Sequence, residues 1–355
     1  MSRKVLITGG SGFVGSCLGL GLAQRYPDWK IAALDNLKRR GSELNLPRLK
    51  QAGIEFIHGD VRNKEDLDPV ALQPDLILEC SAEPSVLAGY TSPGYVLQTN
   101  LVGTINCLEL ARQTQADFIF LSTSRVYPIA HLNALKFRET ETRFQLLDEQ
   151  SLPGVSSQGI SEEFPLDGAR SLYGATKLAS ELLIAEYADA YGLRTVVDRC
   201  GVLTGPWQMG KVDQGVFALW MAAHYFGRSV KYIGYGGTGK QVRDFLHIAD
   251  LLDLIDIQIQ NLDKLKGQTF NVGGGTENTL SLYETTLLCQ EITGQQIAIT
   301  PVPDNRTGDV PIYITNSSKI MQTTGWKPQR NAQTTLTDIY QWISEYKHIV
   351  SNVFA

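Results

Sequence analysis

The chain has 355 residues, of which 43% are hydrophobic and 19% are charged, and its formal net charge is −5. This length supports one large domain or two interlocked domains around a sizeable buried core. The acidic balance argues against a general nucleic-acid-binding protein, which normally carries a basic surface, but it leaves room for a local basic pocket that binds a phosphate-bearing substrate.

The first predicted strand leads directly into a glycine-rich turn and a helix. Residues 4–16 read KVLITGGSGFVGS, and three of the glycines have the spacing Gly9-x-x-Gly12-x-x-Gly15. A strand, a tight glycine turn and a helix in this order bind a pyrophosphate, because backbone N–H groups and the helix N-terminus can approach the phosphates closely. Glycine turns also occur for purely structural reasons. Here Asp35, at the end of a second apolar run at 30–35, supplies a carboxylate for the ribose hydroxyls, so a dinucleotide site is the stronger prediction.

The residues after Asp35 bear on the choice of dinucleotide. Asn36 follows it, and residues 38–40 are a basic triplet that could hold the 2′-phosphate of NADP or could form a solvated loop. An acidic residue at the end of this strand repels that phosphate and prefers the hydroxyls of NAD. We therefore expect NAD as the cofactor.

Further apolar runs at 54–58, 76–79 and 118–122 are predicted strands, with a predicted helix at 96–113. Strands that alternate with helices at this interval build a doubly wound parallel sheet of the α/β (Rossmann) class, and ligands bind at the carboxyl ends of its strands. Asp60 and Val61 could therefore bind an adenine edge. Ser81 and Ala82 are small enough to let a cofactor lie close, and Asn100 lies on the following helix.

The second half of the chain is less regular. Residues 128–168 form a polar insertion, after which a helix at 171–191 and a strand at 194–199 are predicted. Helices are then predicted near 213–226, 249–261 and 281–292. We expect a Rossmann domain at 1–200, with the insertion at about 128–168, and a smaller, mostly α-helical substrate-binding lobe at 201–355 that could return one strand to the sheet.

The chemistry is predicted from Tyr173 and Lys177, which lie four residues apart and so share one helix face. An ordinary tyrosine has a pKa near ~10, too high for a base at neutral pH, and a neighbouring ammonium together with an oxidised nicotinamide lowers it. Tyr173 could then take a proton from a sugar hydroxyl that Thr123, at the end of a strand, orients. A Tyr and a Lys at this spacing also occur by chance in many helices, where the tyrosine belongs to the core and the lysine is solvated.

With these motifs in place, the chain resembles the extended short-chain dehydrogenase/reductase superfamily over essentially its full length. Within it, the chain is most similar to the CDP-tyvelose 2-epimerase family, also called the CDP-paratose 2-epimerase family. The segments that carry this closer similarity are residues 35–37 (DNL), 139–143 (ETETR), 173–177 (YGATK), 213–215 (DQG) and 239–244 (GKQVRD).

The resemblance implies a bound NAD that is reduced and reoxidised in each turnover, with Tyr173 removing the proton from the C2 hydroxyl, Lys177 as its partner and Thr123 as the substrate-binding hydroxyl. It also implies that Arg243 and Arg306 bind the nucleotide diphosphate near Asp309, and that two helices, near 96–113 and 171–191, form a homodimer interface. The full predicted set of cofactor-binding residues is Gly9, Gly12, Phe13, Val14, Gly15, Asp35, Asn36, Asp60, Val61, Ser81, Ala82, Asn100, Tyr173 and Lys177.

Several alternatives stay open, because residues 79–82, Pro128 and residues 200–204 depart from the usual family pattern. A 4,6-dehydratase normally needs an Asp-Glu pair beside the threonine, whereas Ser124 and Arg125 follow Thr123 here. A C4-epimerase, a keto-sugar reductase and a Rossmann scaffold without catalysis are the other candidates.

The cysteines and the apolar runs bear on the compartment. The five cysteines have no C-x-x-C spacing, so we expect reduced thiols and no metal site. The N-terminus lacks a signal-like segment, and no apolar run approaches the ~20 residues that span a bilayer. We therefore expect a cytoplasmic enzyme that acts on a nucleotide-diphosphate sugar, with no nucleic-acid or membrane partner.

Overall fold

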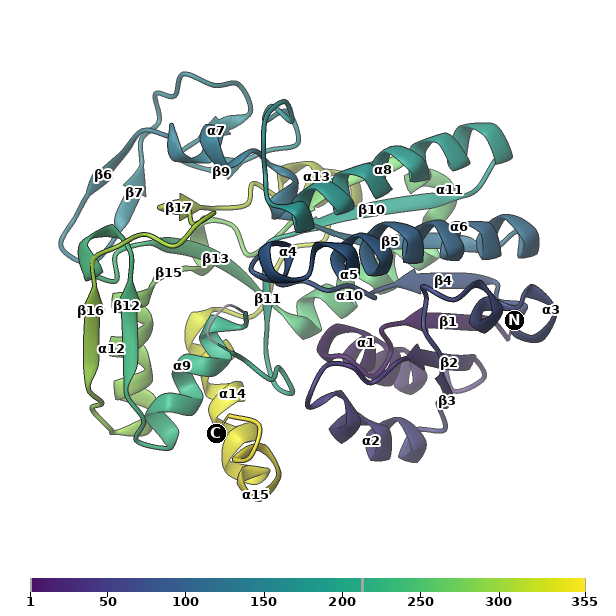
Figure 1. Ribbon diagram of the computed structural model, residues 1–355, viewed down its shortest axis with the longest axis horizontal. Helices are drawn as coiled ribbons and strands as arrows, with labels where there is room; N and C mark the ends of the chain where they lie inside the picture. Colours follow the sequence, from purple (N-terminus) through teal and green to yellow (C-terminus); the bar gives the residue numbers. More distant parts are fainter. Residues whose placement is uncertain (1, 212–213, 355) are drawn as a thin grey trace. The chain divides into compact units, whose positions relative to one another are not determined.

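A computed structural model describes residues 2–211 and 214–354, and Figure 1 shows the order of their elements. The chain passes repeatedly between two units. Unit 1 consists of Met1–Val126, Leu172–Arg199 and Leu252–Thr269, and unit 2 consists of Tyr127–Ser171, Cys200–Leu251 and Phe270–Ala355. Of the segments that carry the family resemblance, one includes Asp213, which lies outside the described residues.

The main sheet is formed largely by unit 1 and has, within the described residues, seven strands in the order β14-β10-β5-β4-β1-β2-β3 (Figure 1). The pairings of β1 with β2 and β4, of β2 with β3 and of β4 with β5 are parallel. The strand order reverses at β1, where such sheets bind ligands. The strands are β1 (Lys4–Thr8), β2 (Lys30–Asp35), β3 (Glu55–His58), β4 (Leu76–Glu79), β5 (Asp117–Thr123), β10 (Thr195–Cys200) and β14 (Gln268–Val272).

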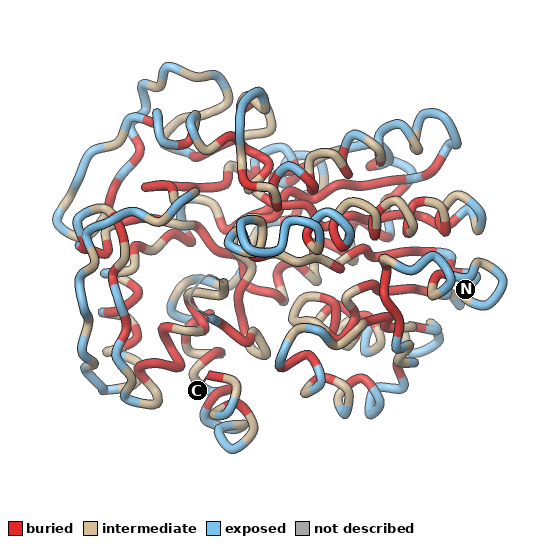
Figure 2. The backbone as a smooth tube through the Cα atoms, viewed as in Figure 1, coloured by how far each residue is buried: buried red, intermediate tan, exposed pale blue. Residues whose placement is uncertain are grey.

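Helices cover both faces of this sheet, so its central strands are buried on both sides and consist largely of apolar residues. Helices α6 (Gly103–Thr114) and α8 (Leu172–Tyr191) pack together against β4 and β5. Side chains of this face, including Phe118, Phe120 and Ile184, form one buried cluster. Figure 2 shows the buried strands and the helices with one buried and one exposed side. The doubly wound α/β fold is confirmed.

One predicted helix differs from the expectation. The segment predicted as a single helix at 96–113 consists of α5 (Pro93–Leu97), a π-helical turn η3 (Gln98–Val102) and α6. π-helical turns insert one extra residue per turn and occur frequently at functional sites. This one places Asn100, which is completely buried, against the start of α8.

Unit 2 contains short sheets and a group of three packed helices, α9 (Val216–Tyr225), α12 (Leu282–Thr293) and α14 (Ala332–Glu345). Strand β13 (Val242–His247) pairs with β11 (Val202–Thr204), β15 (Thr279–Ser281) and β17 (Ile312–Tyr313). Strand β12 (Val230–Ile233) pairs with β16 (Ile299–Val302), and β6 (Phe137–Glu139) forms a hairpin with β7 (Phe144–Leu146). The sequence predicts α9 and α12, but it predicts neither α14 nor these strands, most of which are only two to four residues long.

The remaining elements are short, apart from α1 and α10. They are α1 (Phe13–Arg25), η1 (Ser42–Asn45), α2 (Leu46–Gln51), η2 (Lys64–Leu67), α3 (Pro69–Leu72), α4 (Ala88–Thr91), η4 (Ser124–Val126), α7 (Ile129–Asn133), β8 (Val155–Ser156), β9 (Gly159–Ile160), η5 (Tyr235–Gly237), α10 (Ile248–Gln260), α11 (Leu262–Leu265), η6 (Thr276–Asn278), α13 (Ser318–Thr324) and α15 (Lys347–Val350).

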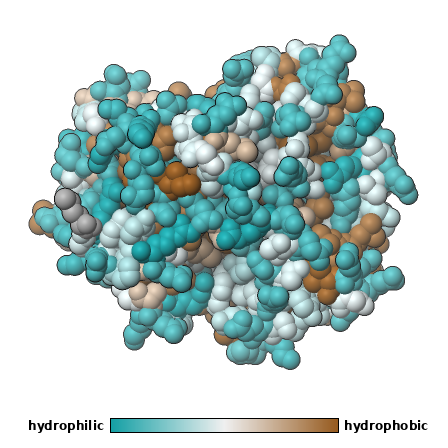
Figure 3. Space-filling model, turned by 180° about the vertical axis from the view of Figure 1, so that it is seen from behind, coloured by the Kyte–Doolittle hydropathy of each residue, from teal (hydrophilic) through white to brown (hydrophobic). Residues whose placement is uncertain are grey.

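The surface shown in Figure 3 is mostly hydrophilic, with hydrophobic residues in separate patches. Across residues 2–211 and 214–354, we find no helix with the length and apolar character needed to cross a membrane. No disulfide joins the cysteines in this part of the chain, and Cys107, Cys200 and Cys289 are buried.

Candidate active site

The glycine turn between β1 and α1 leads directly into the N-terminus of α1. Gly9 has a φ of +63°, which favours glycine, and its carbonyl accepts a hydrogen bond from the N–H of Gly12 at 3.0 Å. A Cβ atom at Gly15 would lie 2.3 Å from the carbonyl oxygen of Gly9, so no side chain fits there. Helix α1 begins after Gly12 with no side-chain cap and no acidic residue in its first turn. Its first N–H groups and positive dipole end therefore suit a pyrophosphate.

Asp35 connects this turn to the end of β2. Its Oδ2 atom accepts a hydrogen bond from the N–H of Ser11 at 3.1 Å, and its Oδ1 atom accepts one from the N–H of Leu37 at 2.8 Å. The carboxylate is therefore held in a fixed orientation beside the glycine turn, where a ribose would need it. These features fit a dinucleotide, and the turn, Phe13, Val14 and Asp35 are the residues that would hold it.

The end of β3 is also a polar site. Asp60 accepts hydrogen bonds from Asn36 Nδ2 at 2.9 Å and from Arg62 Nη2 at 2.6 Å. The Arg62 guanidinium is the main reason that the pKa of Asp60 is lowered to about 2. Lys38, the first residue of the basic triplet, lies with its Nζ 3.9 Å from the ring centroid of Tyr95. Asn36, Asp60 and the neighbouring Val61 thus lie at the edge predicted to bind adenine.

Asn100 fixes the loop that follows β4. Its Oδ1 atom accepts the N–H of Glu83 at 2.7 Å, and its Nδ2 atom donates to the carbonyl of Glu83 at 3.1 Å and to Thr176 Oγ1 at 3.3 Å. The side chain therefore joins the loop that contains Ser81 and Ala82 to α8. Ser81 itself donates a hydrogen bond to Glu79 Oε1 at 2.6 Å.

The predicted catalytic residues all belong to unit 1. Thr123 ends β5 and is 7% exposed, while Tyr173 (8%) and Lys177 (2%) lie in the first two turns of α8. Helix α8 packs on β5 and on η4, the short turn after Thr123. A phenol and an ammonium are thus buried on one helix face that packs beside the end of β5.

A buried ion pair one turn further along α8 holds this helix in place. Glu181 accepts a hydrogen bond from Arg199 Nη2 on β10 at 2.7 Å, and it also accepts one from the hydroxyl of Ser122 on β5. Arg199 and Glu181 are each 7% exposed. Because Ser122 directly precedes Thr123, this network fixes the distance between the strand end and the helix. This network could not be predicted from the sequence, since the three residues lie far apart in the chain.

The predicted diphosphate-binding residues belong to unit 2 and lie together. Arg243 Nη2 donates to Asp309 Oδ1 at 2.9 Å and to the carbonyl of Val310 at 2.6 Å. Arg306 and Asp309 line an open cavity of about 310 Å³. The other residues that line it are Ile129, Asn133, Phe137, Tyr235, Asn305, Gly308 and Pro311. Asp309 thus partly neutralises Arg243.

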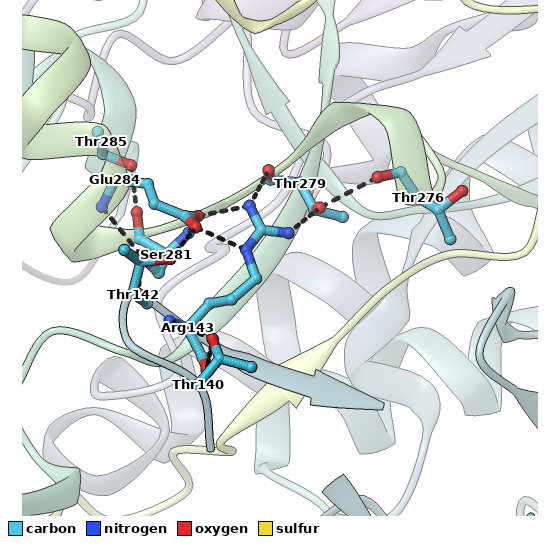
Figure 4. A network of polar contacts seen from close by, with 8 residues as sticks. All are labelled: Thr140, Thr142, Arg143, Thr276, Thr279, Ser281, Glu284 and Thr285. Carbon is cyan, nitrogen blue, oxygen red and sulfur yellow. Dashed lines mark hydrogen bonds and ion pairs between the residues drawn. The ribbon is translucent and has the colours of Figure 1, made fainter. Parts of the chain in front are cut away.

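The ETETR segment at 139–143 makes structural contacts in unit 2, and Figure 4 shows them. Arg143 Nε donates to Glu284 Oε1 at 2.7 Å, Nη1 donates to Thr279 Oγ1 at 2.9 Å, and Nη2 also bonds to Glu284. Glu284 in turn forms a capping box with Ser281 at the start of α12. Arg143 therefore joins the β6–β7 hairpin to α12. Within the described residues, no three His, Cys, Asp or Glu side chains are placed to hold a metal ion.

Comparisons with known proteins match the chain over most of its length. The model of the NAD dependent epimerase/dehydratase family matches residues 5–273. The chain is 33% identical to CDP-paratose 2-epimerase from Salmonella typhi over 96% of this chain and 99% of that protein. It is 26% identical to dTDP-glucose 4,6-dehydratase from Salmonella typhimurium over 99% of this chain and 95% of the other. The structure of UDP-glucose 4-epimerase from Thermus thermophilus, solved in complex with NAD, is 26% identical and superposes with a TM-score of 0.76, covering 96% and 99% of the two chains.

Proposed function

The chain belongs to the NAD dependent epimerase/dehydratase family, and from this premise we propose that it epimerises C2 of a nucleotide-diphosphate sugar, with CDP-paratose and CDP-tyvelose as the pair it interconverts. Its cofactor is NAD. The observation that carries the proposal is the buried pair of Tyr173 and Lys177 on one face of α8, in a chain that is similar to CDP-paratose 2-epimerase over nearly its full length.

In the proposed reaction, the phenolate of Tyr173 takes the proton of the C2 hydroxyl, and Thr123 holds that hydroxyl by a hydrogen bond. When bound, NAD would supply the hydride acceptor for C2 and the hydride donor for the opposite face of the keto sugar. Lys177 stabilises the phenolate by its positive charge. Tyr173 then gives the proton back to the C2 oxygen, so that the sugar is inverted without net oxidation.

Unit 2 supplies the residues proposed to bind the nucleotide. Arg243 and Arg306 are suited to a diphosphate because a guanidinium donates two parallel hydrogen bonds to phosphate oxygens. Asp309, which accepts from Arg243 at 2.9 Å, keeps that guanidinium oriented.

The second candidate is a 4,6-dehydratase, which the 26% identity to dTDP-glucose 4,6-dehydratase brings into consideration. Dehydration needs an acid and a base beside the threonine. In this chain Ser124 and Arg125 follow Thr123, so epimerisation without loss of water is the better proposal. A C4-epimerase and a keto-sugar reductase use the same catalytic residues, and the products separate them from the proposed enzyme.

The experiment is to incubate the purified protein with CDP-paratose, CDP-tyvelose and a small set of UDP- and GDP-sugars without added cofactor, and to identify the products by NMR.

Tyr173→Phe should keep its bound NAD and lose turnover by about 10²-fold or more. Tyr187→Phe, on the same helix but bonded to Glu109 at 2.6 Å, is the matched control and should stay active. An active Tyr173→Phe protein would disprove the assignment of the base.

We also propose that the enzyme acts in the cytoplasm as a homodimer. Leu97 on α5 and Leu182 on α8 are 40% and 65% exposed, and these two helices pack side by side. Apolar side chains on adjacent helices suit a helical interface between two copies. Leu182→Glu should convert a dimer into a monomer in sedimentation measurements. A wild-type protein that sediments as a monomer would refute the proposal.

A further inference from the structure

Beneath the catalytic lysine lies a carboxyl group that the proposed mechanism does not use. Glu79 is the last residue of β4 and is completely buried, and its Oε2 atom lies 3.9 Å from Nζ of Lys177. Lys177 is itself only 2% exposed, and its Nζ lies 4.0 Å from the ring centroid of Phe120. A buried ammonium is costly unless an anion compensates it.

Hydrogen bonds hold Glu79 in this position. Ser81 Oγ donates to Oε1 at 2.6 Å, and Thr104 Oγ1, which also lies 2.8 Å from the carbonyl of Asn100, is 3.3 Å from Oε2. The carboxyl group is therefore fixed from β4, from the loop after it and from α6, and Lys177 approaches it from α8.

We propose that Glu79 is a positioning residue for this reaction, which stays ionised in the working enzyme and acts as the buried counter-charge that keeps Lys177 protonated and directed at Tyr173. The inference deepens the proposed function and rests on it for the part that concerns turnover.

The positive charge of Lys177 favours the ionised carboxylate, whereas burial opposes it. Burial is the larger effect, so the pKa of Glu79 is raised above its usual value, and Lys177 lowers it in part. The thiols of Cys80 and Cys107 also interact with both charges, and burial raises their pKa values, so they are uncharged at neutral pH. On the other side of the ammonium, the proposed mechanism places the phenol of Tyr173. An oxidised nicotinamide adds a further positive charge when NAD is bound, which favours the ionised carboxylate still more.

The first test needs no turnover. It compares the melting temperatures of Lys177→Met, of Glu79→Gln and of the double variant at pH 7. Lys177→Met alone leaves a buried carboxylate without its partner, so the double variant should melt several degrees above Lys177→Met. The matched control is Asp198→Asn, another fully buried carboxyl group of the same sheet, whose effect should simply add to that of Lys177→Met. If the effects of Glu79→Gln and Lys177→Met also add, the proposal is wrong. If both single variants fail to fold, a folded double variant supports the proposal and an unfolded one refutes it.

The second test is the pH dependence of kcat. Without the negative charge of Glu79, the phenolate of Tyr173 forms at lower pH, which moves the acid limb of the profile. The ammonium of Lys177 also loses its proton at lower pH, so the basic limb moves in the same direction. With Glu79→Gln we expect a shift of about 1 to 3 pH units toward acid, and Glu79→Asp should restore most of the original position. An unmoved profile in Glu79→Gln would mean that Glu79 is protonated in the working enzyme and would overturn the inference. If no sugar is turned over at all, the proposed function fails, and the melting experiment still decides the role of Glu79.

Discussion

Asp198 makes the folded state sensitive to pH in a direction opposite to that of most carboxyl groups. It lies fully buried on β10, where its Oδ1 atom accepts a hydrogen bond from Gln258 Nε2 at 2.8 Å. Within the described residues, Asp198 Oδ2 and Gln258 Oε1 are both buried without a hydrogen-bond partner. Burial raises the pKa of Asp198 from 3.8 to about 7, against the weaker lowering effect of Gln258. Protonation of Oδ2 turns this atom into a hydrogen-bond donor, and a donor is the partner that the acceptor Gln258 Oε1 lacks.

The sign of the effect follows from where the proton is bound more tightly. The folded state binds it with a pKa of about 7 and the unfolded state with the ordinary value of 3.8, so the protonated carboxyl stabilises the fold below pH 4. This stabilisation is lost as the pH rises through 7. At about 1.4 kcal/mol per pH unit, the complete loss is about 4 kcal/mol, of which about 3 kcal/mol falls between pH 5 and pH 8.

The test is urea unfolding of wild type and Asp198→Asn at pH 5, 6, 7 and 8, followed by far-UV circular dichroism. Asparagine does not titrate, so the variant should gain about 3 kcal/mol relative to wild type between pH 5 and pH 8. Asp28→Asn, which changes an exposed carboxylate of the same unit, should follow the wild-type curve. Parallel curves for wild type and Asp198→Asn would show that the carboxyl group is ionised in the fold throughout, and the reasoning would be wrong.

Two further predictions concern the glycine turn and the hairpin of unit 2. Gly15→Ala should lower the amount of NAD that copurifies with the protein at least about tenfold, because its Cβ would lie 2.3 Å from Gly9 O. The control is Gly94→Ala, whose Cβ would meet nothing within 4 Å and which should keep its NAD. Equal retention of NAD in both variants would contradict the assignment of the turn. Arg143→Ala should lower the free energy of unfolding by about 2 kcal/mol, because Glu284 loses charged hydrogen bonds. Unchanged stability together with lost activity would instead indicate that Arg143 contacts a ligand.

The sheet could be predicted closely because its strands are buried on both sides. The runs at 30–35 and 76–79 coincide with β2 and β4 to the residue, since a central parallel strand is a nearly continuous apolar segment. The π-helical turn η3 could not be predicted, because one extra residue in a helical turn leaves the apolar pattern almost unchanged. Strands such as β11, with three residues, are too short to show a period of two.

The candidate site divides in the same way. Gly15, Tyr173 and Lys177 belong to local motifs whose spacing already implies the chemistry, and their roles in NAD binding and catalysis stay predictions. The contact between Glu79 and Lys177 joins residues that are 98 positions apart, and that between Glu181 and Arg199 depends on a helix packing against a strand. Such pairings are created by the tertiary fold, so a single sequence shows at most that a carboxylate ends an apolar run.

The discontinuity of the two units has a consequence for synthesis on the ribosome. β14 is the edge strand beside β10, and it is contributed by residues 268–272. A nascent chain that has not yet reached this point exposes the hydrogen-bonding groups of β10, which can pair with other chains. We therefore expect that unit 1 completes its folding late in translation. A fragment cut near residue 200 should aggregate, although it contains every residue proposed for catalysis.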